Sequence, residues 1–234
     1  MKALKIIGIL AVIVVLVIAG AITYVKVALP DVPDAPDLNV EITPERVERG
    51  KYLANNLMGC MDCHAERDFS KFTAPVIEGT QGGGGEKWGH EGGFEGELYA
   101  PNITPYALKN WTDGEIYRAI TVGVNKNGEA LFPIMPYLQY GKLPDEDIYA
   151  VIAYLRTLPE IENTVPIREL DFPLNLIVNT IPKGNNDKMT HPDHSNKLDY
   201  GKYLVTAGAC IECHTRQEKG EFVMEEYLGG GFEF

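Results

Sequence analysis

A five-residue motif that occurs twice constrains this chain more than any other feature. Residues 60–64 read Cys-Met-Asp-Cys-His and residues 210–214 read Cys-Ile-Glu-Cys-His, and together the two copies use all four cysteines of the sequence. C-x-x-C-H is the attachment signature of c-type haem, in which two thiols bind the porphyrin and the adjoining histidine ligates the iron. The predicted attachment residues are Cys60, Cys63, Cys210 and Cys213, and the predicted axial ligands are His64 and His214.

A zinc site or a redox-active disulfide is the alternative for a lone C-x-x-C pair. Here each pair is followed directly by histidine, and no cysteine is left over. This pattern is typical of haem attachment and not of the other two sites. We therefore expect two c-type haems as the cofactors.

The composition is that of a globular protein with an acidic surface. The 234 residues are 45% hydrophobic and 23% charged, which leaves room for two modest domains. The formal net charge of -12 argues against a nucleic-acid binder. An acidic surface either meets basic patches on redox partner proteins or is simply solvated, and the sequence leaves both open.

The N-terminal segment is apolar enough to span a membrane. Residues 6–25 contain no charged residue, and about 20 apolar residues suffice for a membrane-spanning helix. Lys2 and Lys5 precede this run, so the positive-inside rule places the N-terminus in the cytoplasm and the haem domains on the periplasmic side. A cleaved signal peptide ending at residues 19–21 is the alternative, but its apolar region is usually shorter. We expect residues 1–28 to be a retained, single-pass anchor in the cell membrane.

Residues 29–42 are rich in proline and aspartate. Such a composition favours an extended, self-repelling linker. At about 3.1 Å per residue, residues 30–40 of this linker would hold the first haem domain roughly 30 Å from the membrane. This predicts a tethered domain that can swing between neighbouring proteins.

Three helices are expected in the first haem domain, residues 43–160. Thr43 followed by proline is a good start for a helix that runs to about residue 56, just before the first motif. Residues 112–115 (Thr-Asp-Gly-Glu) form a capping box, and the helix that they begin should end near Gly123. A third helix should start near Pro144, with an apolar stripe formed by Ile148, Val151, Ile152 and Leu155.

Met135 is the predicted sixth ligand of the first haem iron. It lies between two prolines, in a segment that cannot be regular helix. A lone methionine is more often a core residue. Its position after a C-x-x-C-H motif, with a helix on each side, favours His/Met ligation, which raises the reduction potential and suits electron carriage.

Several segments carry a resemblance to a known family. They are residues 50–53 (Gly-Lys-Tyr-Leu), 99–105 (Tyr-Ala-Pro-Asn-Ile-Thr-Pro), 111–116 (Trp-Thr-Asp-Gly-Glu-Ile) and 135–137 (Met-Pro-Tyr). With the haem motif, the span 43–158 resembles class I cytochromes c. More narrowly, it is similar to the multihaem cytochrome subunits of membrane-bound alcohol and aldehyde dehydrogenases. The resemblance implies an all-α fold around covalent haem, with His64 and Met135 on opposite faces of the iron.

A second copy of the haem domain is indicated by an internal repeat. Gly-Lys-Tyr-Leu recurs at residues 201–204, and Gly-Gly-Phe occurs at residues 92–94 and 230–232. We expect residues 161–196 to join the domains and residues 197–234 to begin the second one. This second copy looks incomplete, because the spacing of the first copy would place its methionine ligand beyond Phe234. No sixth ligand of the second haem is predicted.

These observations favour an electron-transfer protein over an enzyme, because iron with both axial positions filled offers no site for a substrate. The leading hypothesis is a mobile, membrane-anchored carrier between a quinol-oxidising complex or a dehydrogenase and a terminal oxidase. The alternative is a fixed cytochrome subunit of a membrane-bound dehydrogenase. A third hypothesis, a di-haem peroxidase or haem sensor, requires an open position on one iron.

Overall fold

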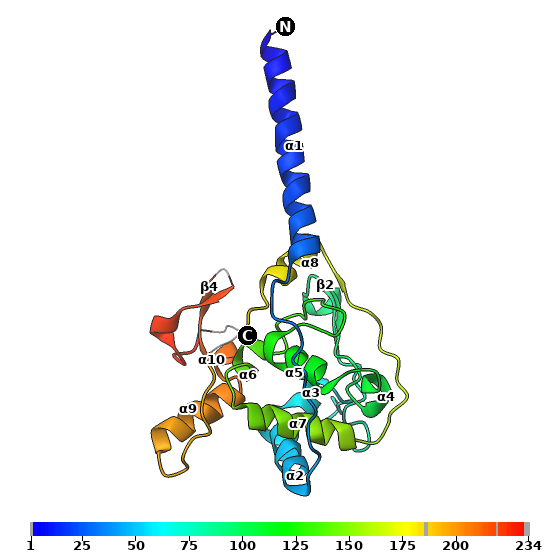
Figure 1. The fold of residues 1–234 in the computed structure, drawn as a ribbon, viewed down its shortest axis with the longest axis vertical. Coiled ribbons are helices and arrows are strands. Elements are labelled where there is room, and N and C mark those ends of the chain that lie inside the picture. Colours follow the sequence, from blue (N-terminus) through cyan, green and yellow to red (C-terminus); the bar gives the residue numbers. More distant parts are fainter. Residues whose placement is uncertain (1, 185–186, 219, 232–234) are drawn as a thin grey trace.

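The protein consists of one long N-terminal helix that projects from a helical body (Figure 1). A computed structural model of the chain describes residues 2–184, 187–218 and 220–231. The α-helices are α1 (Lys2–Ala28), α2 (Pro44–Tyr52), α3 (Cys60–Cys63), α4 (Pro105–Leu108), α5 (Asp113–Val122), α6 (Tyr137–Tyr140), α7 (Asp145–Thr157), α8 (Leu174–Ile177), α9 (Lys197–Ala207) and α10 (Ile211–His214). Between them lie a π-helical turn and short 3-10 helices, η1 (Leu53–Leu57), η2 (His90–Gly92), η3 (Val178–Thr180) and η4 (Met224–Glu226). The strands are β1 (Lys87–Trp88), β2 (Gly96–Tyr99), β3 (Glu169–Leu170), β4 (Gln217–Glu218) and β5 (Glu221–Phe222).

Helix α1 is suited to a bilayer and not to the protein core. Its 27 residues include none that is buried, and the helix is long and apolar enough to cross a membrane. At 1.5 Å per residue it measures about 40 Å, more than the hydrocarbon thickness of about 30 Å. The predicted membrane anchor is therefore supported.

The core of the body is built where α2 crosses α7. Gly50 permits this crossing, because a Cβ atom at residue 50 would lie 1.8 Å from the backbone oxygen of Ala150. The four residues of the predicted α7 stripe are all buried, with exposed fractions of 4% or less. The amphipathic pattern in the sequence thus identified the central helix of the core.

The helix boundaries follow the capping signals in the sequence. The Thr43 hydroxyl accepts a hydrogen bond from the Arg46 amide at the start of α2. Thr112 and Glu115 form both hydrogen bonds of the predicted capping box at α5. This helix ends at Gly123, whose φ of 78° is accessible to glycine at little cost.

The linker does not hold the body away from the membrane as the sequence predicted. It runs back along the body from the end of α1 to α2 (Figure 1). The Val40 amide donates to the Asp113 carboxylate at 2.9 Å, and Gly114 lies so close to Pro36 that a Cβ atom would meet its carbonyl oxygen at 1.7 Å. The prediction of a swinging tether is therefore wrong, because contacts with α5 fix the extended chain.

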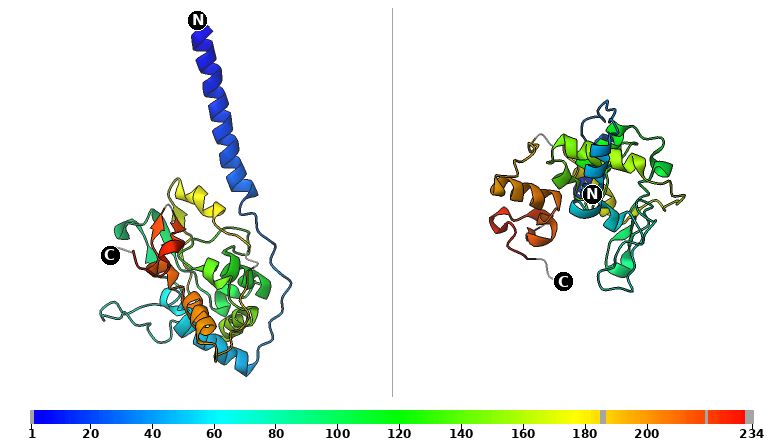
Figure 2. Two further views of the ribbon diagram at one scale, coloured as in Figure 1. Left: turned by 90° about the vertical axis from the view of Figure 1, so that its left-hand side faces the viewer. Right: turned by 90° about the horizontal axis from the view of Figure 1, so that it is seen from below.

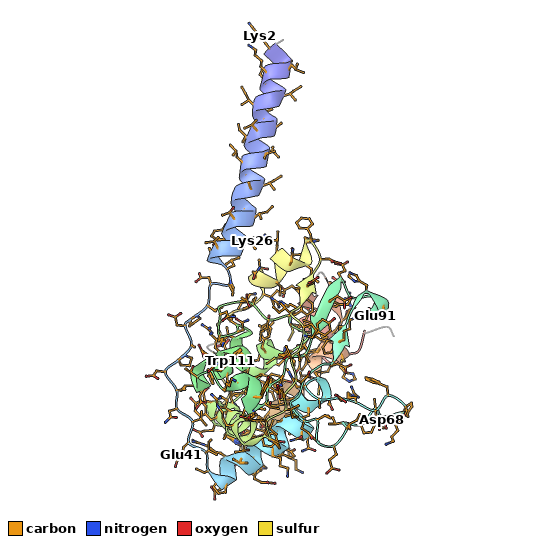
Figure 3. All side chains as sticks on the ribbon, turned by 90° about the vertical axis from the view of Figure 1, so that its right-hand side faces the viewer. Lys2, Lys26, Glu41, Asp68, Glu91 and Trp111 are labelled. Atoms are coloured by element: carbon orange, nitrogen blue, oxygen red, sulfur yellow. The ribbon has the colours of Figure 1, made fainter. Side chains whose placement is uncertain are left out.

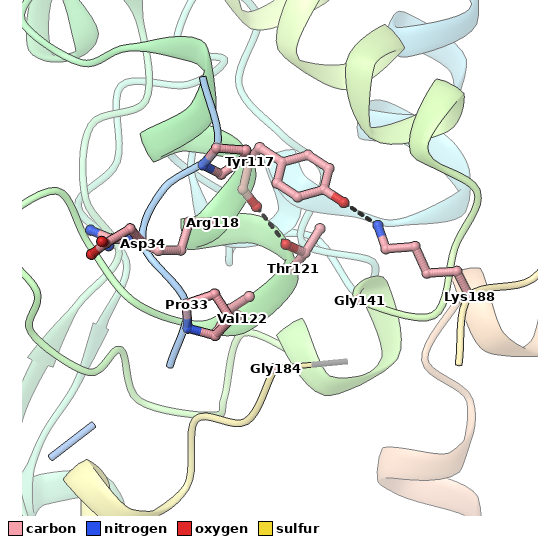
Figure 4. A pocket seen from close by; sticks show the side chains of 10 residues that line it. Pro33, Asp34, Tyr117, Arg118, Thr121, Val122, Gly141, Gly184 and Lys188 are labelled. Atoms are coloured by element: carbon pink, nitrogen blue, oxygen red, sulfur yellow. Dashed lines mark hydrogen bonds between the residues drawn. The ribbon is translucent and has the colours of Figure 1, made fainter. Parts of the chain in front are cut away.

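A cavity of about 210 Å³ remains between the linker and α5. Figure 4 shows Pro33 and Asp34 of the linker on one side and Tyr117 of α5 on the other, with the Tyr117 hydroxyl bonded to Lys188. Lys188 also pairs with Asp145. Residues that follow the first domain thus reach back and help to enclose the linker.

The glycine-rich region after the first motif takes part in a small antiparallel sheet. Strand β2 pairs antiparallel with β1, and also with β3, where Gly96 lies opposite Leu170. The Lys87 ammonium bridges the two carboxylates of Glu91 and Glu97 at 2.9 and 2.8 Å. This small sheet attaches the segment between the two repeats to the first domain.

The second repeat packs directly on the first. The view from below in Figure 2 shows α9, in orange, against the green helices of the first domain. Tyr203 and Ala207 of α9 are 1% and 0% exposed and belong to the same hydrophobic core as α7. The Tyr203 hydroxyl donates to Asp147 at 2.8 Å and accepts from Arg49 at 2.7 Å. The two repeats therefore share one core.

Candidate haem sites

The first motif forms a single helical turn, α3, which begins shortly after η1, the π-helical turn that continues α2. Gly59 has a φ of 63° and turns the chain between the two helical segments. Cys60 and Cys63 are three residues apart, so their thiols share one face of α3. Burial raises the pKa of the Cys60 thiol to about 12 and also raises that of Cys63. Both cysteines are unpaired.

His64 is oriented as a metal-ligating imidazole. Its Nδ1 lies 2.7 Å from the Pro101 carbonyl oxygen, so this nitrogen carries the proton and Nε2 is the free, basic nitrogen. Burial lowers the pKa of His64, while the bond to Pro101 opposes that shift. A neutral imidazole with Nε2 available is the form that binds iron.

Gly84 contacts both the backbone of His64 and the backbone of residues 100–102, which include the hydrogen-bond partner of His64. Its amide donates to the His64 carbonyl at 3.1 Å. A Cβ atom at residue 84, where φ is 70°, would lie 2.5 to 2.6 Å from backbone atoms of residues 100–102. The adjoining Asn102 side chain is buried and bonds to Thr104 and to the carbonyls of Ile161 and Asn163. Pro101 is thereby fixed opposite His64.

Met135 lies in irregular backbone, as predicted, and packs against the hydrophobic core. Its amide bonds to the Phe132 carbonyl at 3.4 Å. The ring of Phe132 meets that of Phe94 edge to face, with centroids 5.0 Å apart. The glycine-rich region thus supports the methionine loop.

The second motif repeats the local geometry of the first. Ala209 takes the place of Gly59, with a φ of 49°. The Glu212 amide donates to the Ala209 carbonyl, as the Asp62 amide does to the Gly59 carbonyl, each at 3.0 Å. The Gly230 amide donates to the His214 carbonyl at 2.8 Å, as Gly84 does to His64.

The hydrogen bond from Gly230 to His214 corrects the alignment of the two copies that the sequence suggested. Gly230 corresponds in structure to Gly84, and not to Gly92 as the recurring Gly-Gly-Phe suggested. The Phe232 of that repeat lies outside the described residues. The first copy also has one residue more between its Gly-Lys-Tyr-Leu segment and its motif. The π-helical turn η1 accommodates this residue.

Helix α6 connects the methionine loop with both motifs. It begins two residues after Met135. Its Gln139 side chain donates to Glu212 of the second motif at 3.3 Å, and its Tyr140 hydroxyl donates to the Met58 carbonyl, next to the first motif, at 2.7 Å. Burial raises the pKa of the Glu212 carboxyl. Neither bond was predicted, because nothing in the sequence pairs residues so far apart.

The residues present fit covalent haem better than the other uses of paired cysteines. Within the described parts of the chain, no group of three or more histidine, cysteine or acidic side chains could hold a metal ion by itself. Each motif instead offers two free thiols beside an imidazole. The other histidines have different partners: His90 pairs with Asp171 at 2.7 Å, and His191 and His194 stack on tyrosines.

A helical body that presents C-x-x-C-H motifs is the architecture of cytochromes c, and the relatives of the chain are of this class. It is 30% identical to the fructose dehydrogenase cytochrome subunit of Gluconobacter japonicus over 185 residues, which are 72% of the chain and 34% of that protein. It is 27% identical to the cytochrome c subunit of the quinone alcohol dehydrogenase of Gluconobacter oxydans over 207 residues, 79% of the chain and 38% of that subunit. A diheme cytochrome c-type protein of Cereibacter sphaeroides is 29% identical over 182 residues, 74% of the chain and 59% of that protein.

The homologues of this chain are thus cytochrome c subunits of membrane-bound dehydrogenases, with a diheme cytochrome c among them. No family model matches the chain. The chain spans between about a third and three fifths of the length of these curated relatives.

Proposed function

We propose that this protein is a membrane-anchored cytochrome c that binds two c-type haems and transfers single electrons as a fixed subunit of a membrane-bound dehydrogenase. Bound haem supplies the one-electron couple. Cys60 and Cys63 attach one haem, and Cys210 and Cys213 attach the other. His64 and Met135 ligate the first iron and His214 ligates the second.

The packed linker and the names of the relatives support a fixed subunit over the mobile carrier that the sequence first favoured. A mobile carrier needs a linker free of the body, but here the linker is bonded to α5 through Asp113. The relatives are named as subunits of fructose and alcohol dehydrogenases. A dehydrogenase is therefore the proposed partner, and its substrate is left open.

The observation that carries the di-haem proposal is the contact of α6 with both motifs. In this proposal residues 43–160 hold one haem and the segment from residue 197 begins the site of the other. Gln139 and Tyr140 are neighbours in sequence and bond to residues of the second and first motif regions. A rigid helix that spans both sites would keep the two haems at a constant separation, as transfer from haem to haem requires.

The anchor gives the proposed topology. Lys2 and Lys5 lie before the apolar run and Lys26 lies after it. With the N-terminus in the cytoplasm, both haem sites face the periplasm, where c-type haem is compatible with an oxidising compartment.

The first experiment is a denaturing intact mass of the protein from its native membrane, because covalent haem survives denaturation. We expect the mass of two haems above that of the polypeptide. The Cys210→Ala/Cys213→Ala variant should retain one haem. Wild-type protein with one haem or none would contradict the proposal, and so would failure to copurify with a dehydrogenase subunit.

Met135→Leu tests the axial ligand, since leucine keeps the volume and removes the thioether. We expect the first haem to become high-spin and its potential to fall. Met189→Leu is the matched control, because Met189 lies outside the hydrophobic core around Met135. Its backbone amide donates to the Lys142 carbonyl, and this bond does not involve the side chain that the substitution changes. An unchanged spectrum in Met135→Leu would mean that another residue ligates the iron.

A further inference from the structure

The segment that joins the two repeats contains an uncharged stretch next to the membrane anchor. Residues 172–182 include no aspartate, glutamate, lysine or arginine. They form α8 and η3, and both elements contact α1. In Figure 1, α8 (yellow) lies at the top of the body, beside the lower end of α1. We call residues 170–182 the crossover segment.

One side of the crossover segment is fixed to the body. Leu170 pairs with Gly96 in the small sheet. The Asp171 carboxylate accepts from His90 Nε2 at 2.7 Å. Val178 is 2% exposed. The segment is therefore attached to the body on this side, while α8 and η3 contact α1.

The other side of the crossover segment is apolar and uncovered. Phe172 is 74% exposed and Ile177 is 48% exposed. A short helix on an aqueous surface places polar residues on its outer side, and single exposed apolar residues need no explanation. Here the exposed apolar residues belong to an uncharged stretch that contacts α1, the helix suited to a membrane, so their exposure does need an explanation.

We propose that the crossover segment lies in the membrane interface and inserts Phe172 and Ile177 between the lipid headgroups of the outer leaflet. Lys26 marks the end of the apolar run of α1, and α1 itself ends at Ala28. Elements that contact this end of α1 lie at the headgroup level, where aromatic side chains are favoured. Insertion of an apolar face by about 5 to 10 Å is typical of helices bound at this level.

The consequence is a second membrane attachment. A single helix lets the body rotate about the helix axis and tilt. Contact through α1 and the crossover segment together would fix both motions, so that the same face of the haem body always meets a membrane-bound partner. This goes beyond the proposed electron transfer and does not depend on which residues ligate haem.

The test uses the full-length protein with its haems, in nanodiscs of phosphatidylethanolamine and phosphatidylglycerol. A phospholipid with a photoreactive diazirine near the top of one acyl chain is included, and lipid adducts are mapped by peptide mass spectrometry. Phe72 is the matched control: it is fully exposed and lies in the loop of Asp68, which Figure 3 shows far from Lys26. We expect at least tenfold more adduct on the Phe172 peptide than on the Phe72 peptide.

Two variants complete the test. Phe172→Glu/Ile177→Glu should reduce adducts on the crossover segment about tenfold, with α1 adducts and haem content unchanged. Phe72→Glu should change neither. Adducts confined to α1 would overturn the proposal. So would adducts on the crossover segment that disappear when the dehydrogenase complex is intact, because a protein partner and not lipid would then cover it.

Discussion

Tyr203 offers a direct test of how the second repeat is held on the first. Its side chain is 1% exposed, and its hydroxyl lies between the Asp147 carboxylate at 2.8 Å and the Arg49 guanidinium at 2.7 Å. Arg49 also bonds to Asp147 directly, at 2.9 Å. Tyr203→Phe removes both hydroxyl bonds and leaves the ring in place.

The expected cost follows from the burial of this contact. A hydrogen bond to a charged group contributes about 1.5 to 3 kcal/mol. Asp147 is 2% exposed at its side chain and loses one of its donors, whereas Arg49 is 34% exposed and can turn to water. We therefore count the Asp147 bond in full and the Arg49 bond only in part, which gives about 2 to 3 kcal/mol.

Native-state hydrogen exchange measures this effect locally. Amides of α9 in Tyr203→Phe should exchange about 30 to 150 times faster than in the wild type, which corresponds to 2 to 3 kcal/mol. Tyr200→Phe is the control on the same helix, because among the described residues no hydrogen bond of the Tyr200 hydroxyl is found. Equal exchange rates in the two variants would refute the argument that this hydroxyl holds the repeats together.

Three further outcomes are expected from single substitutions. Gly50→Ala should prevent stable folding, because the added methyl group would overlap the α7 backbone. Gly201→Ala, at the equivalent position of α9 where a Cβ atom meets nothing, should stabilise its helix by up to about 1 kcal/mol. Urea denaturation of the two variants and the wild type measures both effects. Gly84→Ala should lower the melting temperature and the yield of covalent haem together, since residue 84 has a φ of 70° and no room for a Cβ atom. Asp171, and to a smaller extent Glu97, raises the pKa of His90. The stabilisation from the His90–Asp171 pair is therefore complete below the unfolded pKa of about 6.5 and is lost as the pH rises through the raised folded pKa. Asp171→Asn should lower the midpoint of the His90 titration measured by NMR.

The sequence predicts the parts of this fold that depend on neighbouring residues. The capping box at Thr112, the end of α5 at Gly123 and the apolar stripe of α7 are all local patterns, and the structure confirms them. The apolar helix α1 is equally local, because its length and hydropathy follow from one run of residues. The candidate site residues follow from the motifs themselves and remain predictions.

Contacts between distant residues could not be predicted. Nothing in the sequence indicates that Pro101 faces His64, or that Gly84 closes against both. The register of the second repeat was misread for the same reason, since Gly-Gly-Phe recurs by letters while the hydrogen bond to the motif histidine selects Gly84. Residues 99–105 contributed to the family resemblance, but the sequence does not show that Pro101 of this segment accepts a hydrogen bond from His64.

The linker shows most clearly how tertiary contacts override composition. Proline and aspartate do favour an extended chain, and residues 31–43 contain no helix or strand. Its direction is set instead by the Val40 amide bond to Asp113, and Asp113 is held in turn by Arg156 at 2.8 Å. The second repeat is tied through Tyr203 and the crossover segment through Asp171. The linker, the second repeat and the crossover segment are therefore each hydrogen-bonded to the first repeat, so that the two candidate haem sites belong to one packed body, which is the arrangement that the proposed fixed subunit requires.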